Sequence, residues 1–220
     1  MQQHATDAGV FIRSMASRGH LGGLAATTPQ ALRVLDAAAF DVVLIETVGV
    51  GQSEVEVAAA ADTTLVMLAP GMGDSIQAAK AGILEIGDVF VVNKADRDGV
   101  DATVRELRNM VALGSRTEGA WDPPVVRTVA STGEGIDRLM DAIDAHGAWL
   151  VESGELEVRR LRRAKDEIEA IAVAMLRRRL EAGAGSERLA RAAAEVAAGL
   201  TDAHSAAALL VDQNGLVDGI

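Results

Sequence analysis

The chain alternates short, β-branched apolar runs with Ala- and Leu-rich stretches of helical spacing, and this alternation restricts it to few folds. The apolar runs predict strands at 9–14, 41–46, 63–69, 88–96 and 123–130. The stretches between them predict helices at 27–40, 100–114 and 135–150, and a loop followed by a helix at 70–87. Repeated strand–helix units of this kind indicate an α/β fold, with a doubly wound, mostly parallel sheet flanked by helices.

The pattern changes beyond residue 150, where the sequence predicts helices alone. A long helix is predicted at 155–183, and two more follow it. Its apolar stripe, which includes Leu161, Ile168 and Met175, must pack on the first domain or on another copy of the chain. The basic run at 159–165 alternates with acids downstream and predicts a solvated helix face. We therefore expect an α/β domain at 1–150 and an α-helical dimerisation or packing extension at 151–220.

Composition narrows the function classes. The formal net charge of −11 argues against a protein that binds nucleic acid through its phosphates. Cysteine is absent and the four His residues lack metal-ligand spacing, so we expect these His residues in packing or surface roles. With no signal-peptide pattern and no apolar segment of membrane-spanning length, we expect a cytoplasmic protein without a membrane partner. Trp121 is expected to anchor a loop through its indole N–H.

The sequence NKAD at 93–96 follows an apolar strand and predicts recognition of a guanine base. The carboxylate of Asp96 can accept hydrogen bonds from two N–H groups on one edge of the base. Asn93 can bond to the ring and brace neighbouring loops, and the methylene stem of Lys94 can lie along the base. Each charge-assisted hydrogen bond contributes about 1.5–3 kcal/mol, so a paired acceptor discriminates against adenine. The plainer alternative is a strand that ends in a polar turn.

The sequence ASTGEG at 130–135 lies one strand–helix unit later and fits a second wall of the same base pocket. Ala130 and Ser131 are the candidate residues, and we expect the N–H of Ala130 to meet the guanine carbonyl oxygen. Gly133 and Gly135 allow a tight path into the next helix. Ligands of parallel sheets bind where the strands end, so these segments should meet at one edge, together with 46–52 and 70–74.

The sequence IETVGVGQS at 45–53 is interpreted as a loop that senses a terminal phosphate and acts as a switch. Glu46 ends a predicted strand, where its carboxylate can hold Mg²⁺, through water because this ion keeps much of its hydration shell. Gly49 has no side chain, so its N–H can approach the phosphate. A buried acid followed by structural glycines is the alternative.

One part of a nucleotide site is not found in these 220 residues, namely the Gly-rich loop with Lys-Ser/Thr that cradles a β-phosphate. The segment AAKAG at 78–82 comes nearest, but it lies within a predicted helix. Either that segment was lost from the sequence, or the chain does not hydrolyse a nucleotide at all. Such a chain is expected to be deficient in hydrolysis on its own.

With ETVGVGQSE, PGMGD, NKAD and TGEG in this order, the chain resembles the methylmalonyl-CoA-mutase-associated GTPases (MeaB). This family is also known as ArgK or the lysine/arginine/ornithine (LAO/AO) transport ATPases, in the signal-recognition, MinD and BioD class of P-loop proteins. The stretch FIRSMASRGHLGGLA is especially specific. The resemblance implies an incomplete, N-terminally truncated P-loop GTPase fold, in which Met1 is an internal Met of a longer protein. It further implies a homodimer that binds GTP and GDP with Mg²⁺. It also implies a chaperone that gates cofactor loading of an adenosylcobalamin-dependent acyl-CoA mutase and protects that mutase.

The resemblance also assigns roles to single residues. Glu46 falls at the Mg²⁺-linked acid, Gly49 at the glycine that senses the γ-phosphate, and Gln52 at a water-positioning residue. Asn93, Lys94 and Asp96 fall at the base-recognition motif, and Asp74, Gln77 and Lys80 fall in a mobile loop that couples nucleotide state to the mutase. Val129 stands where related GTPases often carry a Ser that braces the base-binding loop, which weakens that contact.

Three functions remain open from the sequence. The first is a GTP-hydrolysing chaperone of a B12-dependent mutase, and the second is a non-enzymatic dimerising or partner-binding fragment built on the helices at 155–220. The third is a nucleotide-dependent kinase or ATPase linked to basic amino-acid transport, which no basic or membrane-like feature of the chain supports. Guanine-nucleotide binding separates the first two, and pull-down with the mutase separates the first from the third.

Overall fold

The computed structural model describes residues 4, 6–15, 28–47, 58–71, 83–113 and 119–212. The chain divides into two compact units, Met1–Arg163 and Ala164–Ile220. The first unit contains a sheet and the second is helical. The domain boundary that the sequence predicts between residues 150 and 151 remains a prediction. Of the helices in the described ranges, none has both the length and the apolar character that a membrane span requires.

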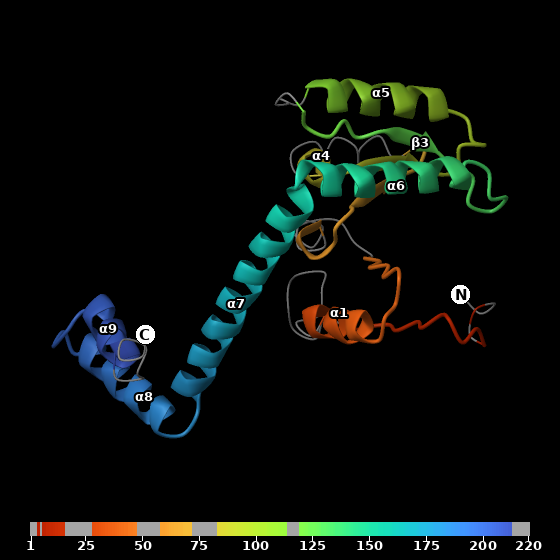
Figure 1. Ribbon diagram of the computed structural model, residues 1–220. Helices are drawn as coiled ribbons and strands as arrows, with labels where there is room; N and C mark the ends of the chain where they lie inside the picture. Colours follow the sequence, from red (N-terminus) through yellow and green to blue (C-terminus); the bar gives the residue numbers. More distant parts are fainter. Residues whose placement is uncertain are drawn as a thin grey trace. The chain divides into compact units, whose positions relative to one another are not determined.

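A three-stranded parallel sheet lies in the first unit (Figure 1). Its strands are β1 (Leu65–Leu68), β2 (Val89–Val92) and β3 (Val125–Arg127), in the order β1-β2-β3. The helix α4 (Ile83–Ile86) precedes β2, α5 (Val100–Leu113) connects β2 to β3, and α6 (Ile136–Ser153) follows β3. The sequence-based prediction of an α/β fold with a parallel sheet is therefore confirmed.

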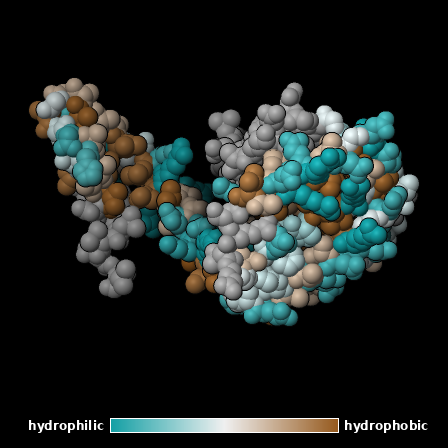
Figure 2. Space-filling view, turned by 90° about the horizontal axis from the view of Figure 1, so that it is seen from above, coloured by the Kyte–Doolittle hydropathy of each residue, from teal (hydrophilic) through white to brown (hydrophobic). Residues whose placement is uncertain are grey.

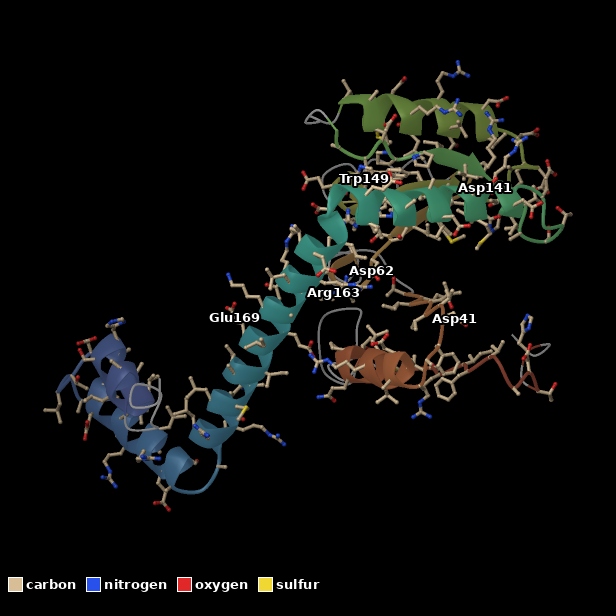
Figure 3. The ribbon with its side chains drawn as sticks, viewed as in Figure 1. Asp41, Asp62, Asp141, Trp149, Arg163 and Glu169 are labelled. Carbon is tan, nitrogen blue, oxygen red and sulfur yellow. The ribbon has the colours of Figure 1, made fainter. Side chains whose placement is uncertain are left out.

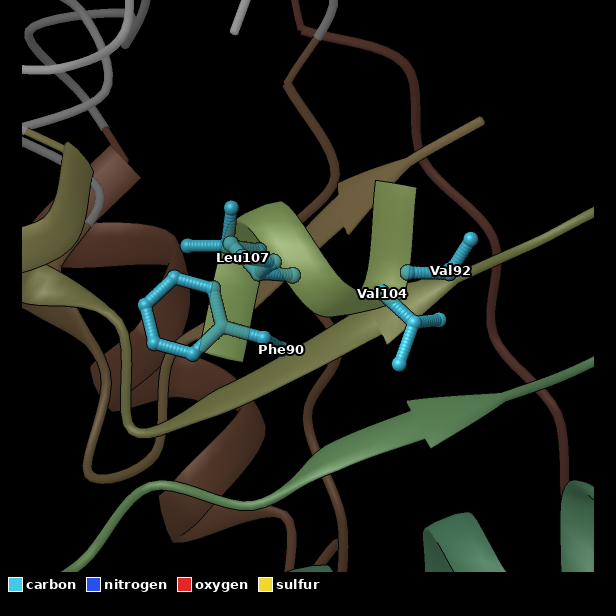
Figure 4. Close-up of a cluster of buried hydrophobic side chains, with 5 residues drawn as sticks. Phe90, Val92, Val104 and Leu107 are labelled. Carbon is cyan, nitrogen blue, oxygen red and sulfur yellow. The ribbon is translucent and has the colours of Figure 1, made fainter. Parts of the chain in front are cut away.

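All four residues of β2 are buried, because successive side chains point to opposite faces of the sheet and both faces are covered. One face packs against α5, in a cluster formed by Val66, Phe90, Val92, Val104 and Leu107 (Figure 4). The other face packs against α6, in a cluster formed by Val89, Val91 and Val126, with Leu139 and Ala142 beside it. Helices on both faces make the sheet doubly wound, as predicted.

The N-terminal part of the first unit differs from the prediction. The helix predicted at 27–40 is present as α1 (Thr28–Ala37), with Pro29 in its first turn. The strand predictions at 9–14 and 41–46 are wrong for the described residues, since both segments are irregular and join no ladder. Val42 and Leu44 are 72% and 87% exposed. An apolar, β-branched sequence becomes a strand only where a neighbour takes up its N–H and C=O groups, and no described segment does so here.

The second unit consists of helices. The helix α7 (Glu155–Glu181) begins in the first unit and continues into the second, where α8 (Ala184–Ala197) and α9 (Ala203–Asp212) follow. The helices α8 and α9 pack together, and Ala206 and Leu210 of α9 are buried. At Gly185, a Cβ atom would overlap the carbonyl oxygen of Arg179, so only glycine permits the close approach of these segments.

The apolar stripe predicted on α7 is exposed in the described chain. No residue of α7 is buried, and Leu161, Ile168 and Met175 are 74%, 67% and 51% exposed. Figure 2 shows hydrophobic residues on the surface of the C-terminal helices. The surface that covers this stripe therefore remains a prediction.

Candidate functional site

The carboxyl ends of the strands form one edge of the sheet, where two of the predicted segments meet. The ladder continues beyond the strands, because the N–H of Asn93 donates to the carbonyl oxygen of Leu68 at 2.8 Å. The N–H of Thr128 likewise donates to the carbonyl oxygen of Val92 at 3.0 Å. The segments that begin at Asn93 and Thr128 therefore leave the sheet side by side.

The side chain of Asn93 joins these two segments. Its Oδ1 accepts a hydrogen bond from the N–H of Ala130 at 3.1 Å and another from the hydroxyl of Thr128 at 3.3 Å. In the same place, the N–H of Ala95 donates to the carbonyl oxygen of Thr128 at 3.0 Å. The structure thus brings together NKAD and ASTGEG, the segments from which the sequence predicts one pocket.

The N–H of Ala130 has a partner other than the one the sequence predicts. We expected it to meet the carbonyl oxygen of guanine, whereas in the structure it donates to Asn93. One N–H can be shared between two acceptors, as three-centre hydrogen bonds show. A bound base would therefore share or replace the bond to Asn93.

The remaining residues of NKAD form an exposed turn. Lys94 has a φ angle of 56°, in the left-handed region that costs a non-glycine residue about 1–2 kcal/mol. The N–H of Arg97 closes the turn on the carbonyl oxygen of Lys94 at 3.1 Å. Asp96 and Ser131 are exposed, and the carboxylate of Asp96 makes no hydrogen bond or ion pair with another described residue. Strained backbone conformations of this kind cluster at binding and active sites.

The second segment returns to the sheet through a tight loop. The N–H of Val129 donates to the carbonyl oxygen of Glu134 at 2.9 Å, so residues 129 and 134 form an isolated bridge. Gly133 and Gly135 have φ angles of 82° and 79°. A Cβ atom at Gly135 would overlap the carbonyl oxygen of Arg127. The predicted role of these two glycines, a tight path into the following helix, is confirmed.

The other predicted site residues are not part of this edge as described. Glu46 is exposed, near the end of the irregular segment 41–47, and belongs to no described strand. Residues Gly49, Gln52, Asp74, Gln77 and Lys80 lie outside the described residues. Pro70 and Gly71, the first two residues of PGMGD, follow β1 and are described.

No group of three or more His, Asp or Glu side chains within the described ranges is placed to hold a metal ion. Glu46 offers a single exposed carboxylate. A single carboxylate fits Mg²⁺ where phosphate oxygens and water complete the coordination, but it does not make a site by itself. The chemistry of the described residues is therefore compatible with Mg²⁺ that arrives with a nucleotide.

A second polar cluster, which the sequence did not predict, lies at the opposite edge of the sheet. Asp88, directly before β2, accepts the N–H of Thr64 at 2.8 Å and both terminal nitrogens of Arg159 at 3.1 and 2.9 Å. His146 of α6 is fully buried, with Nδ1 at 2.8 Å from the hydroxyl of Thr63 and Nε2 at 3.3 Å from Oδ1 of Asp88. We call these five residues the amino-edge cluster.

Two Trp side chains enclose the imidazole of this cluster. The rings of Trp121 and Trp149 lie 4.9 and 5.8 Å from that of His146, and Trp149 is stacked on it. The indole N–H of Trp121 donates to the carbonyl oxygen of Asp88 at 2.7 Å. The predictions that Trp121 anchors a loop and that His146 has a packing role are confirmed. Both Trp residues of an aromatic-poor chain gather here, although nothing in the sequence places them together.

The ion pair between Asp88 and Arg159 gives the amino-edge cluster a structural role. Burial by itself raises the pKa of Asp88, but contacts with His146, Arg159 and the N–H of Thr64 together outweigh it. The pKa of Asp88 therefore lies below its ordinary value of 3.8. A carboxylate that is charged and paired at neutral pH holds segments together and is unsuited to proton transfer.

The first turns of α7 are tied to the loop before β1. Arg163 lies 2.7 Å from a carboxylate oxygen of Asp62 (Figure 3), and Arg159 donates to the carbonyl oxygen of Asp62 at 3.0 Å. The side chains of Arg159 and Arg163 are only 26% and 31% exposed. The prediction of a solvated face for the basic run at 159–165 is wrong for these two residues, because acids distant in the sequence lie against them.

The parallel sheet and its two helical layers define a class of protein. A solved LAO/AO transport system kinase matches 84% of this chain and 60% of its own, with a TM-score of 0.61 and 25% identity. The chain thus has the α/β fold of P-loop GTPase-like proteins.

The family follows from the sequence comparison. The chain belongs to the methylmalonyl-CoA mutase-associated GTPases, MeaB, whose family model matches residues 1–184. One relative is a protein of Pyrococcus abyssi that is named as a GTPase by inference. It is 50% identical to this chain over 184 residues, which is 83% of this chain and 57% of the relative. GTPase ArgK of Escherichia coli is 38% identical over 67% of this chain and 45% of its own.

A further relative is the mitochondrial methylmalonic aciduria type A homolog of Mus musculus. It is 36% identical over 73% of this chain and 39% of its own. The chain spans about half the length of the curated relatives it matches, between 39% and 57% for these three.

Proposed function

We propose that this chain supplies the guanine-binding part of a GTP-binding and GTP-hydrolysing chaperone for an adenosylcobalamin-dependent acyl-CoA mutase. In this role the protein gates cofactor loading and protects the mutase, and it acts as a cytoplasmic homodimer. The family is named for its association with methylmalonyl-CoA mutase, and its members in bacteria and archaea carry GTPase names. These names support the class of activity and the class of partner.

The observation that carries the proposal is the bonding of Asn93 to Ala130 and Thr128. These bonds hold the turn after β2 against a loop that lies 35 residues further along the chain. A pocket for a flat base does need two such walls held at a fixed spacing, since the base is gripped from more than one side. The bond therefore favours the base-pocket interpretation of NKAD over the polar-turn alternative.

Recognition of the base follows from the groups at this edge. The exposed carboxylate of Asp96 accepts the two N–H groups that guanine presents on one edge and adenine lacks as a pair. The stem of Lys94 covers the face of the base. Ala130 and Ser131 form the opposite wall, where a backbone N–H meets the guanine carbonyl oxygen.

The phosphate end is assigned to residues near Glu46. Its carboxylate holds Mg²⁺ through water, the N–H of Gly49 meets the terminal phosphate, and Gln52 positions the attacking water. Bound Mg²⁺ would neutralise charge on the phosphate oxygens. Because these 220 residues contain no Walker-type Gly-Lys-Ser/Thr loop, we expect this chain alone to bind nucleotide weakly and not to hydrolyse GTP.

Coupling to the mutase is assigned to the loop that carries Asp74, Gln77 and Lys80, whose order would depend on the nucleotide. The helical extension is assigned to the dimer contact. The exposed stripe of α7, with Leu161, Ile168 and Met175, supports this assignment because an apolar stripe of this length favours a partner surface.

The second candidate function is a non-enzymatic dimerising or partner-binding fragment with an idle base pocket. The same exposed stripe on α7 favours it, together with the lack of a phosphate-binding motif in the sequence. A kinase or ATPase linked to amino-acid transport is a weaker candidate, supported only by the name of the LAO/AO kinase of similar fold.

The test is calorimetric titration of the chain with GDP, GTP and ADP in the presence of Mg²⁺. We expect the guanine nucleotides to bind more tightly than ADP, and Asp96→Asn to weaken GDP binding by about tenfold to a hundredfold, the equivalent of one charged hydrogen bond. Asp98→Asn is the matched control, since Asp98 is exposed and only two residues away. Equal binding of GDP by both variants, or no preference over ADP, would contradict the proposal.

A more discriminating experiment repeats the titration with xanthosine diphosphate. Xanthine has a carbonyl oxygen where guanine has its amino group, and the amide of Asp96→Asn can donate to that oxygen. The variant should therefore gain affinity for the xanthine nucleotide as it loses affinity for GDP. For the partner, pull-down of an acyl-CoA mutase with GTP and with GDP should show nucleotide-dependent capture, and equal capture without nucleotide would favour the second candidate function.

A further inference from the structure

Thr128 makes more bonds to the base-recognition segment than any sequence pattern suggested. The residue is only 2% exposed and directly follows β3. Its N–H donates to Val92, and its carbonyl oxygen accepts the N–H of Ala95 at 3.0 Å. Its hydroxyl completes the set by donating to Oδ1 of Asn93 at 3.3 Å.

The orientation of the Asn93 amide follows from these partners. A backbone N–H can only donate, so the Asn93 atom that faces Ala130 must be the oxygen, Oδ1. The hydroxyl of Thr128 is a second donor to the same oxygen. With its oxygen held by two donors, the amide cannot rotate without losing both bonds, and its NH₂ group is kept for another acceptor.

The position of this hydroxyl resolves the departure that the sequence showed at Val129. A Ser at that position would brace the base-binding loop, and Val129 is instead apolar and 5% exposed. The hydroxyl that reaches Asn93 comes from the preceding residue, Thr128. From the sequence we expected Val129 to weaken the brace of the base-binding loop. In the structure a hydroxyl brace is present, and Thr128, one position earlier, supplies it.

We infer that Thr128 is a positioning residue for base recognition, whose hydroxyl fixes the Asn93 side chain between the two walls of the pocket. The inference rests on the proposed function, because it names a residue that prepares the guanine site without touching the base. A merely structural role would predict a loss of stability and no change in how Asn93 is held. A positioning role predicts a change in Asn93 and in guanine affinity at nearly unchanged stability.

The test compares Thr128→Val, which keeps the shape and removes the hydroxyl, with Thr128→Ser, which keeps the hydroxyl. Thr103→Val is the matched control, because Thr103 is likewise buried and its hydroxyl donates to the carbonyl oxygen of Gly99, one helical turn earlier, at 3.2 Å. For GDP, we expect Thr128→Val to weaken binding about threefold to tenfold, the range for one neutral hydrogen bond. Thr128→Ser and Thr103→Val should bind GDP as the unaltered chain does.

A second measurement needs no nucleotide. Hydrogen exchange followed by NMR should show faster exchange of the Ala130 N–H, and averaged side-chain amide signals of Asn93, in Thr128→Val and in neither of the other variants. If the unaltered chain binds no GDP, the proposed function fails, and this measurement alone decides the role of Thr128. Unchanged Ala130 exchange and unchanged Asn93 signals in Thr128→Val would overturn the inference, as would unchanged GDP affinity in a chain that binds GDP.

Discussion

Replacing Asp88 with Ala is expected to lower the free energy of unfolding by about 4 kcal/mol. Removing one partner of a buried ion pair costs about 3–5 kcal/mol, because the other charge is left uncompensated. Arg159 keeps its bond to the carbonyl oxygen of Asp62 at 3.0 Å and is 26% exposed. The cost of leaving the charge of Arg159 without Asp88 should therefore lie near the lower limit of that range. The N–H of Thr64 also loses its acceptor, which adds about 1 kcal/mol or more.

Two further variants separate the charge from the hydrogen bonds. Asp88→Asn keeps the volume and one acceptor oxygen, so we expect a smaller loss of about 2 kcal/mol. The control is Asp101→Asn, since Asp101 and Arg127 form an ion pair at 2.7 Å with side chains that are 74% and 45% exposed. An exposed pair contributes about 0–1 kcal/mol, so the same change of charge should have little effect there.

Urea unfolding followed by Trp fluorescence is the assay, because the two Trp residues of the chain both lie against His146 of the amino-edge cluster. The dependence of the unfolding free energy on urea should stay the same in all variants, so that shifts of the midpoint report stability. An Asp88→Ala variant as stable as Asp101→Asn would refute the reasoning that the amino-edge cluster is a buried ion pair.

Three more predictions concern the same unit. Folding lowers the pKa of Asp88 below its ordinary value of 3.8, so its ion pair adds stability that is fully present above that value and is lost as pH falls through the lower folded pKa. Between about pH 7 and about pH 3, Asp88→Asn should therefore lose less stability than the unaltered chain in the urea assay. Gly135→Ala should cost about 2 kcal/mol or more, because its Cβ would overlap the carbonyl oxygen of Arg127, whereas Gly133→Ala has open space and should cost about 1 kcal/mol in thermal unfolding. Trp121→Phe should cost about 1–2 kcal/mol by calorimetry, since the carbonyl oxygen of Asp88 loses the indole donor, and no change would mean that water replaces it fully.

The central strands could be predicted from the sequence because their apolar runs have the pattern of buried strands and neighbouring strands pair with them. The run VFVV of β2 is apolar at every position, as expected of a strand covered on both faces, and the structure buries all four residues. The polar residues that follow β2 and β3 had to meet, since parallel strands end at one edge. Asn93 and Ala130 are bonded there, as that geometry requires.

The N-terminal strand predictions failed for a reason that sequence alone cannot show. The run at 41–46 has the same composition as a buried strand. It becomes a strand only if a neighbouring segment forms hydrogen bonds with its backbone N–H and C=O groups. Val42 and Leu44 are exposed where none of the described segments pairs with them. Local propensity is thus a necessary condition for a strand and not a sufficient one.

The amino-edge cluster could not be predicted because its members are scattered along the chain. Arg159 and Asp88 are 71 residues apart, and Thr63 and His146 are 83 apart. The sequence around Arg159 is a basic run that usually faces solvent. Only the packing of α6 and the first turns of α7 onto the sheet turns that run into a set of ion pairs.

The short central strand β2 has a practical consequence for mutational work on this protein. Asp88 immediately precedes its first residue and Asn93 immediately follows its last, so only four residues separate the anchor of α7 from the base-recognition turn. A short segment that is hydrogen-bonded along both sides shifts as a unit. Any variant inside it, such as one at Phe90, will therefore disturb both edges at once, and a loss of nucleotide affinity in such a variant says nothing about which edge caused it.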